Sequence, residues 1–143
     1  MSRFACLTGL AVFVLVAISF GQRPIEAVAV VSLTNQTGTT QGTLYTPQET
    51  GLFRVTLMLQ CTGGPGQQMS DLNPYFTFVD DNGPEFYFPG TGQDGQPLPP
   101  QSWSFVIKLI GGNPLIWNVQ LAANDTSTYE TYILLEKIET KTQ

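Results

Sequence analysis

Polar and apolar residues alternate along much of the chain after residue 27, as they do in β-strands that bury one face. From residue 51 to 61, Phe53 and Val55 begin an apolar set on one face, while Arg54 and Thr56 begin a polar set on the other. The alternation predicts eight strands, at residues 28–33, 42–45, 51–61, 74–79, 85–88, 102–110, 115–121 and 129–138.

Turn-forming residues separate these segments. Asp81-Asn82-Gly83 lies between two aromatic-rich strands and predicts a tight hairpin, because Asn and Gly tolerate a positive φ. Gly111-Gly112-Asn113-Pro114 predicts a second hairpin, between the sixth and seventh strands. Residues 62–70 and 89–101 are rich in Gly, Pro and Gln, so we expect surface loops there.

The strand pattern also predicts how the chain closes. No helix of useful length and no repeat of fixed period follow the first 21 residues. Two packed sheets are the simplest way to cover the apolar faces of eight short antiparallel strands with one core. We therefore expect an all-β fold, a single antiparallel two-sheet sandwich over residues 22–143, because 143 residues leave little room for a second core.

The amino terminus has a different pattern, in which Arg3 precedes an uncharged apolar stretch from residue 4 to 21. This pattern predicts a signal peptide over residues 1–21, with cleavage after Gly21 or after the Ala27-Val28-Ala29 triplet. An uncleaved anchor is the alternative, although the stretch is short for a membrane span, which needs about 20 apolar residues. We expect a secreted or cell-surface protein without a membrane span in its mature chain.

Cysteine usage adds little to this expectation. Removal of the signal takes Cys6 away and leaves Cys61 alone, so the mature chain forms no internal disulfide. Cys61 ends an alternating apolar run, which favours a small buried hydrophobic residue over a reactive thiol or an intermolecular bridge.

Four segments resemble a known group of proteins. They are LYTP at 44–47, GLFRV at 51–55, FVDD at 78–81 and YILLEK at 132–137. Their order is similar to that in small secreted β-sandwich proteins of environmental bacteria, and related modules occur beside tail-fibre-like or surface proteins. The resemblance implies export and a jelly-roll-like sandwich. Its motifs are strand and turn residues, so it implies no active-site residue.

Composition excludes several functions. The net charge is −5 and the six Lys and Arg residues are scattered, so no basic patch indicates nucleic-acid binding. The chain has no histidine, which removes Ser-His-Asp and Cys-His catalysis and histidine-ligated metal sites. Its Gly-Thr-Gly and Gly-Gly pairs lack the lysine and the strand-to-helix context of a phosphate-binding loop.

Carboxylates are the remaining candidates for chemistry. A pair about 5 to 10 Å apart suffices for glycoside hydrolysis, and Asp80, Asp81, Glu85 and Asp94 are the nearest group in sequence. Asp80 and Asp81 fall where a hairpin turn already accounts for them. A calcium site formed by Asp80, Asp81, Asn82 and Asp94 is the other possibility, although the spacing matches no EF-hand loop.

Aromatic side chains gather around the same turn and suggest a binding surface. Alternation places some of them on an outer face, where rings beside amides and carboxylates stack on sugars or form a protein interface. The alternative is that the sandwich covers both faces of the hairpin. The candidate ligand-binding residues are Tyr75, Tyr87, Asp80, Asp81 and Asp94.

Two tripeptides, at Asn35 and Asn124, match the N-glycosylation pattern, and turn-forming asparagine is the simpler interpretation of both.

Three hypotheses on function follow from the sequence. The first is an exported, non-catalytic binding or adhesion module that meets a glycan or protein at a cell or virion surface. The second is a structural subunit of an extracellular filament, fibre or surface layer, in which residues 22–31 or edge strands pair with copies of the same chain. The third is a carboxylate-dependent glycoside hydrolase.

Overall fold

The computed structural model describes residues 26–63, 72–89, 100–122 and 127–138. The described part contains eight strands, and every paired strand is antiparallel to its neighbours. The strands are β1 (Glu26–Gln36), β2 (Thr40–Tyr45), β3 (Gly51–Gly63), β4 (Leu72–Asp80), β5 (Gly83–Tyr87), β6 (Gln101–Leu109), β7 (Leu115–Leu121) and β8 (Thr128–Ile138). All eight predicted strands are therefore confirmed. The largest difference in a boundary is three residues, where β1 ends at 36 rather than 33.

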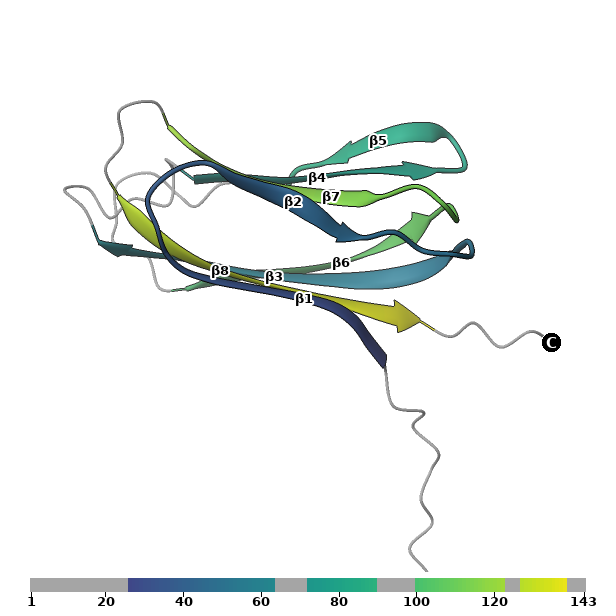
Figure 1. Cartoon of the computed structure of the whole chain (residues 1–143), viewed down its shortest axis with the longest axis horizontal. Helices are drawn as coiled ribbons and strands as arrows, with labels where there is room; N and C mark the ends of the chain where they lie inside the picture. The colour runs from purple at the N-terminus through teal and green to yellow at the C-terminus, as the bar shows by residue number, and fades with distance from the viewer. Residues whose placement is uncertain (1–25, 64–71, 90–99, 123–126, 139–143) are drawn as a thin grey trace, which may run out of the picture.

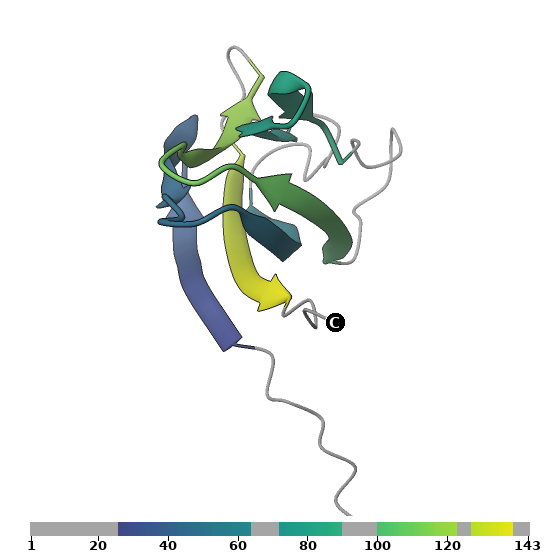
Figure 2. The ribbon, with the colours of Figure 1, turned by 90° about the vertical axis from the view of Figure 1, so that its right-hand side faces the viewer.

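Two four-stranded sheets face each other (Figures 1 and 2). Sheet A has the order β1-β8-β3-β6 and sheet B has the order β2-β7-β4-β5. Each sheet thus joins strands from both ends of the chain, and neighbours in a sheet are rarely consecutive in sequence. This order is the jelly roll, a double Greek key that forms a sandwich. The predicted fold class is confirmed.

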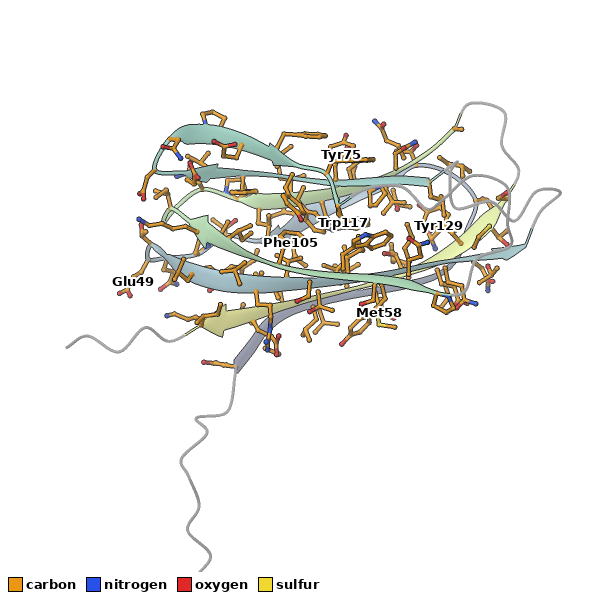
Figure 3. The ribbon with its side chains drawn as sticks, turned by 180° about the vertical axis from the view of Figure 1, so that it is seen from behind. Glu49, Met58, Tyr75, Phe105, Trp117 and Tyr129 are labelled. Carbon is orange, nitrogen blue, oxygen red and sulfur yellow. The ribbon has the colours of Figure 1, made fainter. Side chains whose placement is uncertain are left out.

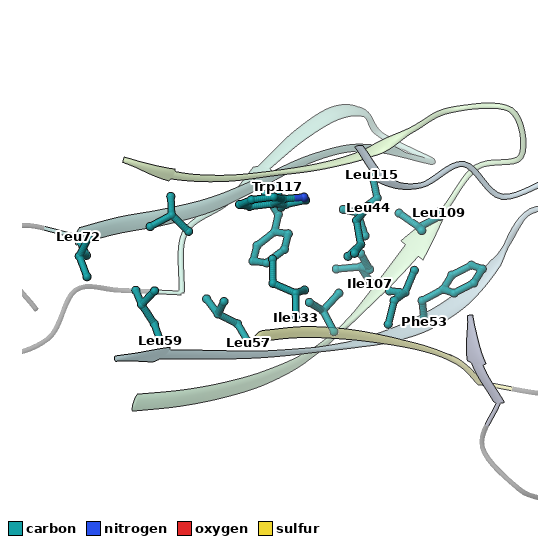
Figure 4. Packing of buried hydrophobic residues seen from close by; sticks show 14 of the residues in the cluster. Leu44, Phe53, Leu57, Leu59, Leu72, Ile107, Leu109, Leu115, Trp117 and Ile133 are labelled. Carbon is teal, nitrogen blue, oxygen red and sulfur yellow. The ribbon is translucent and has the colours of Figure 1, made fainter. Parts of the chain in front are cut away.

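The core lies between the sheets and follows the period-two pattern. In β3, Phe53, Val55, Leu57 and Leu59 point inward and are at most 1% exposed, while Arg54 and its alternates point outward. Trp117 from β7 fills the centre from the opposite sheet (Figure 4). Cys61 is partly buried against this cluster, in agreement with its interpretation as a small hydrophobic residue.

The first predicted hairpin is confirmed. β4 and β5 pair from Phe76 with Tyr87 to Asp80 with Gly83, and Gly83 has a φ of +118°, which an L side chain rarely adopts. Oδ1 of Asp80 accepts a hydrogen bond of 2.7 Å from the backbone N–H of Asn82 and holds the turn.

The second predicted hairpin is wrong. β6 lies in sheet A and β7 in sheet B, so residues 110–114 carry the chain across the sandwich instead of joining paired strands. The glycines serve a close approach to another loop: the N–H of Gly112 donates to the carbonyl of Pro47 over 2.7 Å. The same Gly-Gly-Asn-Pro composition suits either kind of turn, and the pairing of distant strands decides between them.

β1 is an integral edge strand of its own sheet. It pairs with β8 from Glu26 opposite Lys137 to Gln36 opposite Tyr129. Residues 26–31 are therefore part of the fold and not a free segment, and as an edge strand β1 has a partner on one side only among the described residues. The predicted signal peptide, Asp94, Asn124 and most of both predicted loops lie outside the described residues.

Candidate binding surface

Tyr75 and Tyr87 occupy neighbouring strands but opposite faces of sheet B. Phe76 pairs with Tyr87, and Phe76 is 1% exposed in the core, so Tyr87 points toward the interior. Tyr75 is one residue away and therefore points to the outer face of sheet B (Figure 3). The two tyrosines do not form one surface.

Tyr87 helps to close the side of the sandwich between β5 and β6. Its ring stacks on Phe105 of β6, with ring centroids 4.0 Å apart and an angle of 28° between the planes. Phe105 in turn meets Phe76 edge-on at 5.4 Å. Although Tyr87 is 37% exposed, these contacts across the two sheets indicate a packing role.

The predicted acidic candidates are engaged at the β4–β5 turn. Asp80 accepts hydrogen bonds from Asn82, and the carboxylate of Asp81 forms an ion pair with the Lys108 ammonium of β6. Among the residues that the structure describes, no group of three or more acidic, histidine or cysteine side chains is placed to hold a metal ion. Asp94, the remaining member of both predicted sites, lies outside the described residues.

Asn35 lies near the end of β1, where the register with β8 shifts between Leu33 and Gln36. Its φ is +54°, in the left-handed region where asparagine is enriched among residues other than glycine. Asn35 is therefore a residue of β1 at an irregularity of the strand, and the expectation of a turn is not confirmed there.

The outer face of sheet B brings Tyr75 together with residues that the candidate list did not include. Phe86 of β5 is 60% exposed and stacks on Tyr75 with centroids 4.9 Å apart and 29° between the planes. The Tyr75 hydroxyl accepts from Nε2 of Gln120 at 3.4 Å. Nδ2 of Asn118 donates to Oε1 of Gln41 over 3.0 Å. We call these five residues the amide–aromatic strip: Gln41 of β2, Tyr75 of β4, Phe86 of β5, and Asn118 and Gln120 of β7.

Strand register makes the strip continuous across the sheet. Tyr75 is the cross-strand partner of Asn118, and Asn118 is the partner of Gln41. Residues directly opposite each other in neighbouring strands have Cβ atoms about 5 Å apart, so their side chains are neighbours. The sequence signal for the strip is the pair of amides at alternate positions of β7, Asn118 and Gln120, and the register with β2 is needed to add Gln41 to it.

Asn118 is unusual for an outward-facing residue, because its side chain is buried. It is 5% exposed, and its Oδ1 has no hydrogen-bond partner among the described residues. A buried acceptor without a partner costs about 1–3 kcal/mol. Such groups are rare in native structures, so each one calls for an explanation, and a donor from a bound molecule is one.

The outward-facing strand positions of sheet B hold no charged residue among the described residues. Asp80 and Glu85 are the charged residues of its four strands, and both share the inward alternation of Phe78. The outward positions are Gln41, Thr43, Asn73, Tyr75, Thr77, Val79, Pro84, Phe86, Ile116, Asn118 and Gln120. Next to the strip, this face is hollowed into a shallow, largely apolar depression of about 420 Å³. It is lined by Thr77, Phe78, Val79, Pro84, Glu85, Phe86, Pro114 and Ile116, so the carboxylate of Glu85 reaches its border.

Sheet A presents a different outer face, with charged and apolar residues mixed. Nε of Arg54 donates to Glu136 over 2.8 Å, and this hydrogen bond, followed by the charge of Glu136, raises the pKa of Arg54. Val30 and Val106, at the two edge strands, are 54% and 57% exposed, and Tyr132 is 37% exposed between them.

Comparisons with known proteins identify no family. No family model and no curated protein sequence matches the chain. Among solved structures, the chain is similar to one described as "Structure of Eiger TNF from S. frugiperda", with 12% identity and a TM-score of 0.40. That similarity covers 83% of this chain and 91% of the other. Within the described residues, no helix is long and apolar enough to cross a membrane.

Proposed function

We propose that this protein is an exported, non-catalytic binding or adhesion module that acts at a cell or virion surface. Its ligand-binding surface is the amide–aromatic strip on the outer face of sheet B. The observation that carries the proposal is the stacked pair of Tyr75 and the 60% exposed Phe86, which continues into a row of amide side chains. Export rests on the apolar segment at residues 1–21.

The geometry suits binding for two physical reasons. An exposed ring offers a large contact area at a small entropic cost, because it has few rotatable bonds. The strip also lies on strands that are paired on both sides at β4 and β7, and binding residues on regular elements are held more precisely than those on loops.

Substitution on the strip tests the proposal. The exported chain, produced from the complete sequence and labelled with a fluorophore, is titrated onto a panel of cells and virions, and bound label is measured. We expect Phe86→Ala and Tyr75→Ala to weaken binding about tenfold or more, the loss typical of a central aromatic contact.

Tyr132→Ala is the matched control, because Tyr132 is an exposed tyrosine on the outer face of sheet A. It should bind as the unmodified protein does. Equal binding by all three variants would show that the strip is not the binding surface.

A structural subunit of an extracellular filament or layer is the second candidate. The observation that favours it is the exposure of Val30 and Val106 on the two edge strands of sheet A, where a neighbouring copy has access to unpaired backbone groups. Residues 26–31 belong to the β1 edge, so assembly through this edge would use them while they stay paired with β8.

A further inference from the structure

The side chains that the strip exposes indicate which class of ligand it binds. This inference rests on the proposed function. We infer that the amide–aromatic strip binds a neutral glycan. A hexose ring stacks on Phe86, and its hydroxyl groups bond to the side chains of Gln41, Gln120 and Asn118.

The aromatic end of the strip fits the apolar face of a sugar ring. Phe86 is stacked on Tyr75 on one side and is 60% exposed, so ring surface remains open to a ligand. The face of an aromatic ring carries negative partial charge, and the C–H groups on one face of a hexose carry positive partial charge. A flat, weakly polar contact of this kind holds a sugar without requiring a charge.

The amide end fits hydroxyl groups. A hydroxyl is both a donor and an acceptor, and each Asn or Gln side chain offers both a carbonyl oxygen and an NH₂ group. Gln41 and Gln120 are exposed next to Asn118, Gln41 opposite it on β2 and Gln120 two residues further along β7. The Tyr75 hydroxyl, which contacts Gln120, joins the amides to the aromatic pair.

In this proposal, Asn118 discriminates between hydroxyl groups and anionic groups. Its Nδ2 is already engaged with Gln41, whereas its Oδ1 is buried without a partner in the described part of the chain. An acceptor is satisfied by a donor, and a sugar hydroxyl is one. Phosphate, sulfate and carboxylate oxygens only accept when ionised, so an anionic group leaves Oδ1 unsatisfied. Because Oδ1 is buried, a bond to a sugar hydroxyl requires a neighbouring side chain to move, and the proposal assigns this movement to the exposed Gln41 side chain that contacts Asn118.

The distribution of charged residues also favours a neutral glycan over an anionic one. The described cations are Arg54, Lys108 and Lys137, and all three lie on strands of sheet A. Arg54 and Lys108 are also paired with carboxylates. The strip therefore has no cation for a sialylated or sulfated glycan, and recognition of such groups typically uses charge-assisted hydrogen bonds.

The test uses the complete exported chain on an array of neutral glucose-, galactose- and mannose-containing oligosaccharides, printed beside sialylated and sulfated ones. We expect binding to a subset of the neutral oligosaccharides. Phe86→Ala should weaken it about tenfold or more, and Tyr132→Ala should leave it unchanged.

Asn118→Leu separates recognition from stability. Leucine branches at Cγ as asparagine does and removes the unsatisfied acceptor, so the melting temperature should stay the same or rise while glycan binding falls at least about tenfold. Unchanged glycan binding by this variant would overturn the role of Asn118. A folding defect would not obscure the result, because Phe86→Ala changes a largely exposed side chain and reports on the same strip.

Other outcomes show whether the glycan inference fails alone or together with the proposed function. Binding to sialylated or sulfated oligosaccharides alone would overturn the inference of a neutral glycan. Cells are also treated with periodate, which cleaves sugars between adjacent hydroxyl-bearing carbons. Binding that survives this treatment and is still lost in Phe86→Ala would mean a protein ligand, so that the proposed function stands and the glycan inference fails. No binding to any cell, virion or array would remove both.

Discussion

Tyr129 is fully buried, yet both hydrogen-bonding capacities of its hydroxyl are used. The hydroxyl donates to the carbonyl of Gly38 over 2.7 Å, and the Thr40 hydroxyl lies 2.7 Å from the same oxygen. These contacts connect β8 in sheet A to the start of β2 in sheet B. Burial raises the pKa of Tyr129, and the hydrogen bond with Thr40 partly opposes this shift.

Replacement of Tyr129 by Phe should lower the free energy of unfolding by about 1–3 kcal/mol at pH 7, because the carbonyl of Gly38 loses its donor. The raised pKa adds a pH dependence. Below the unfolded pKa of about 10 the hydroxyl is protonated in both states. Above it the unfolded state loses the proton first, so the native protein loses stability as pH rises toward the folded pKa.

Urea denaturation of the unmodified protein and Tyr129→Phe at pH values from 7 to above 10 measures both effects. The difference in unfolding free energy between the two proteins should shrink above pH 10, because the variant lacks this titration. A constant difference would contradict the raised pKa.

At the residue scale, the sequence predicted well which kinds of side chain are available and less well where they point. The period of two puts Tyr129 and Tyr132 on opposite faces of β8, and their exposures of 0% and 37% agree with it. It did not reveal that Tyr75 faces outward while Tyr87 faces Phe105. A period of two defines two faces, but contacts with other strands determine which face is inside.

At the scale of elements, the connection between β6 and β7 shows how a turn depends on distant residues. The N–H of Gly111 donates to the Thr50 hydroxyl over 3.1 Å. A Cβ on Gly111 would lie 2.8 Å from the carbonyl oxygen of Gln48, a backbone atom that cannot easily move away. Gly111 is therefore needed for close contact between the two loops.

We expect Gly111→Ala to destabilise the fold by about 1–3 kcal/mol, the usual cost of overpacking. Gly38→Ala is the matched control, since a Cβ there meets nothing within 4 Å and Gly38 has no positive φ. Thermal unfolding of both variants checks the comparison. A similar melting temperature for both variants would mean that the loop at Gln48 moves away from the added methyl group without a loss of stability.

At the scale of the whole molecule, the two outer faces differ in chemistry. The outward-facing strand positions of sheet B present amides and rings and no charged residue among the described residues, while sheet A combines the Arg54–Glu136 ion pair with exposed valines. A binding module and an assembling subunit would use these faces differently, so the state of association in solution separates the two candidate functions.

Light scattering after size exclusion should show the exported chain as a monomer or a small oligomer if the binding module is correct. A regular polymer, seen by electron microscopy and lost in Val30→Lys or Val106→Lys, would favour the structural subunit instead. Thr43→Lys, on the outer face of sheet B, is the control for added charge alone.

The sequence by itself determined the eight strands, their inward apolar sets and the β4–β5 turn, because these depend on local alternation and on the conformations open to Asp, Asn and Gly. The tertiary structure decided that β6 and β7 belong to different sheets. It also assembled Gln41, Tyr75 and Asn118 into one row, although they are separated by up to 77 positions in the chain. Alternation specifies a strand from its own residues, whereas the neighbours of a strand are chosen by which pairing buries every apolar face at once.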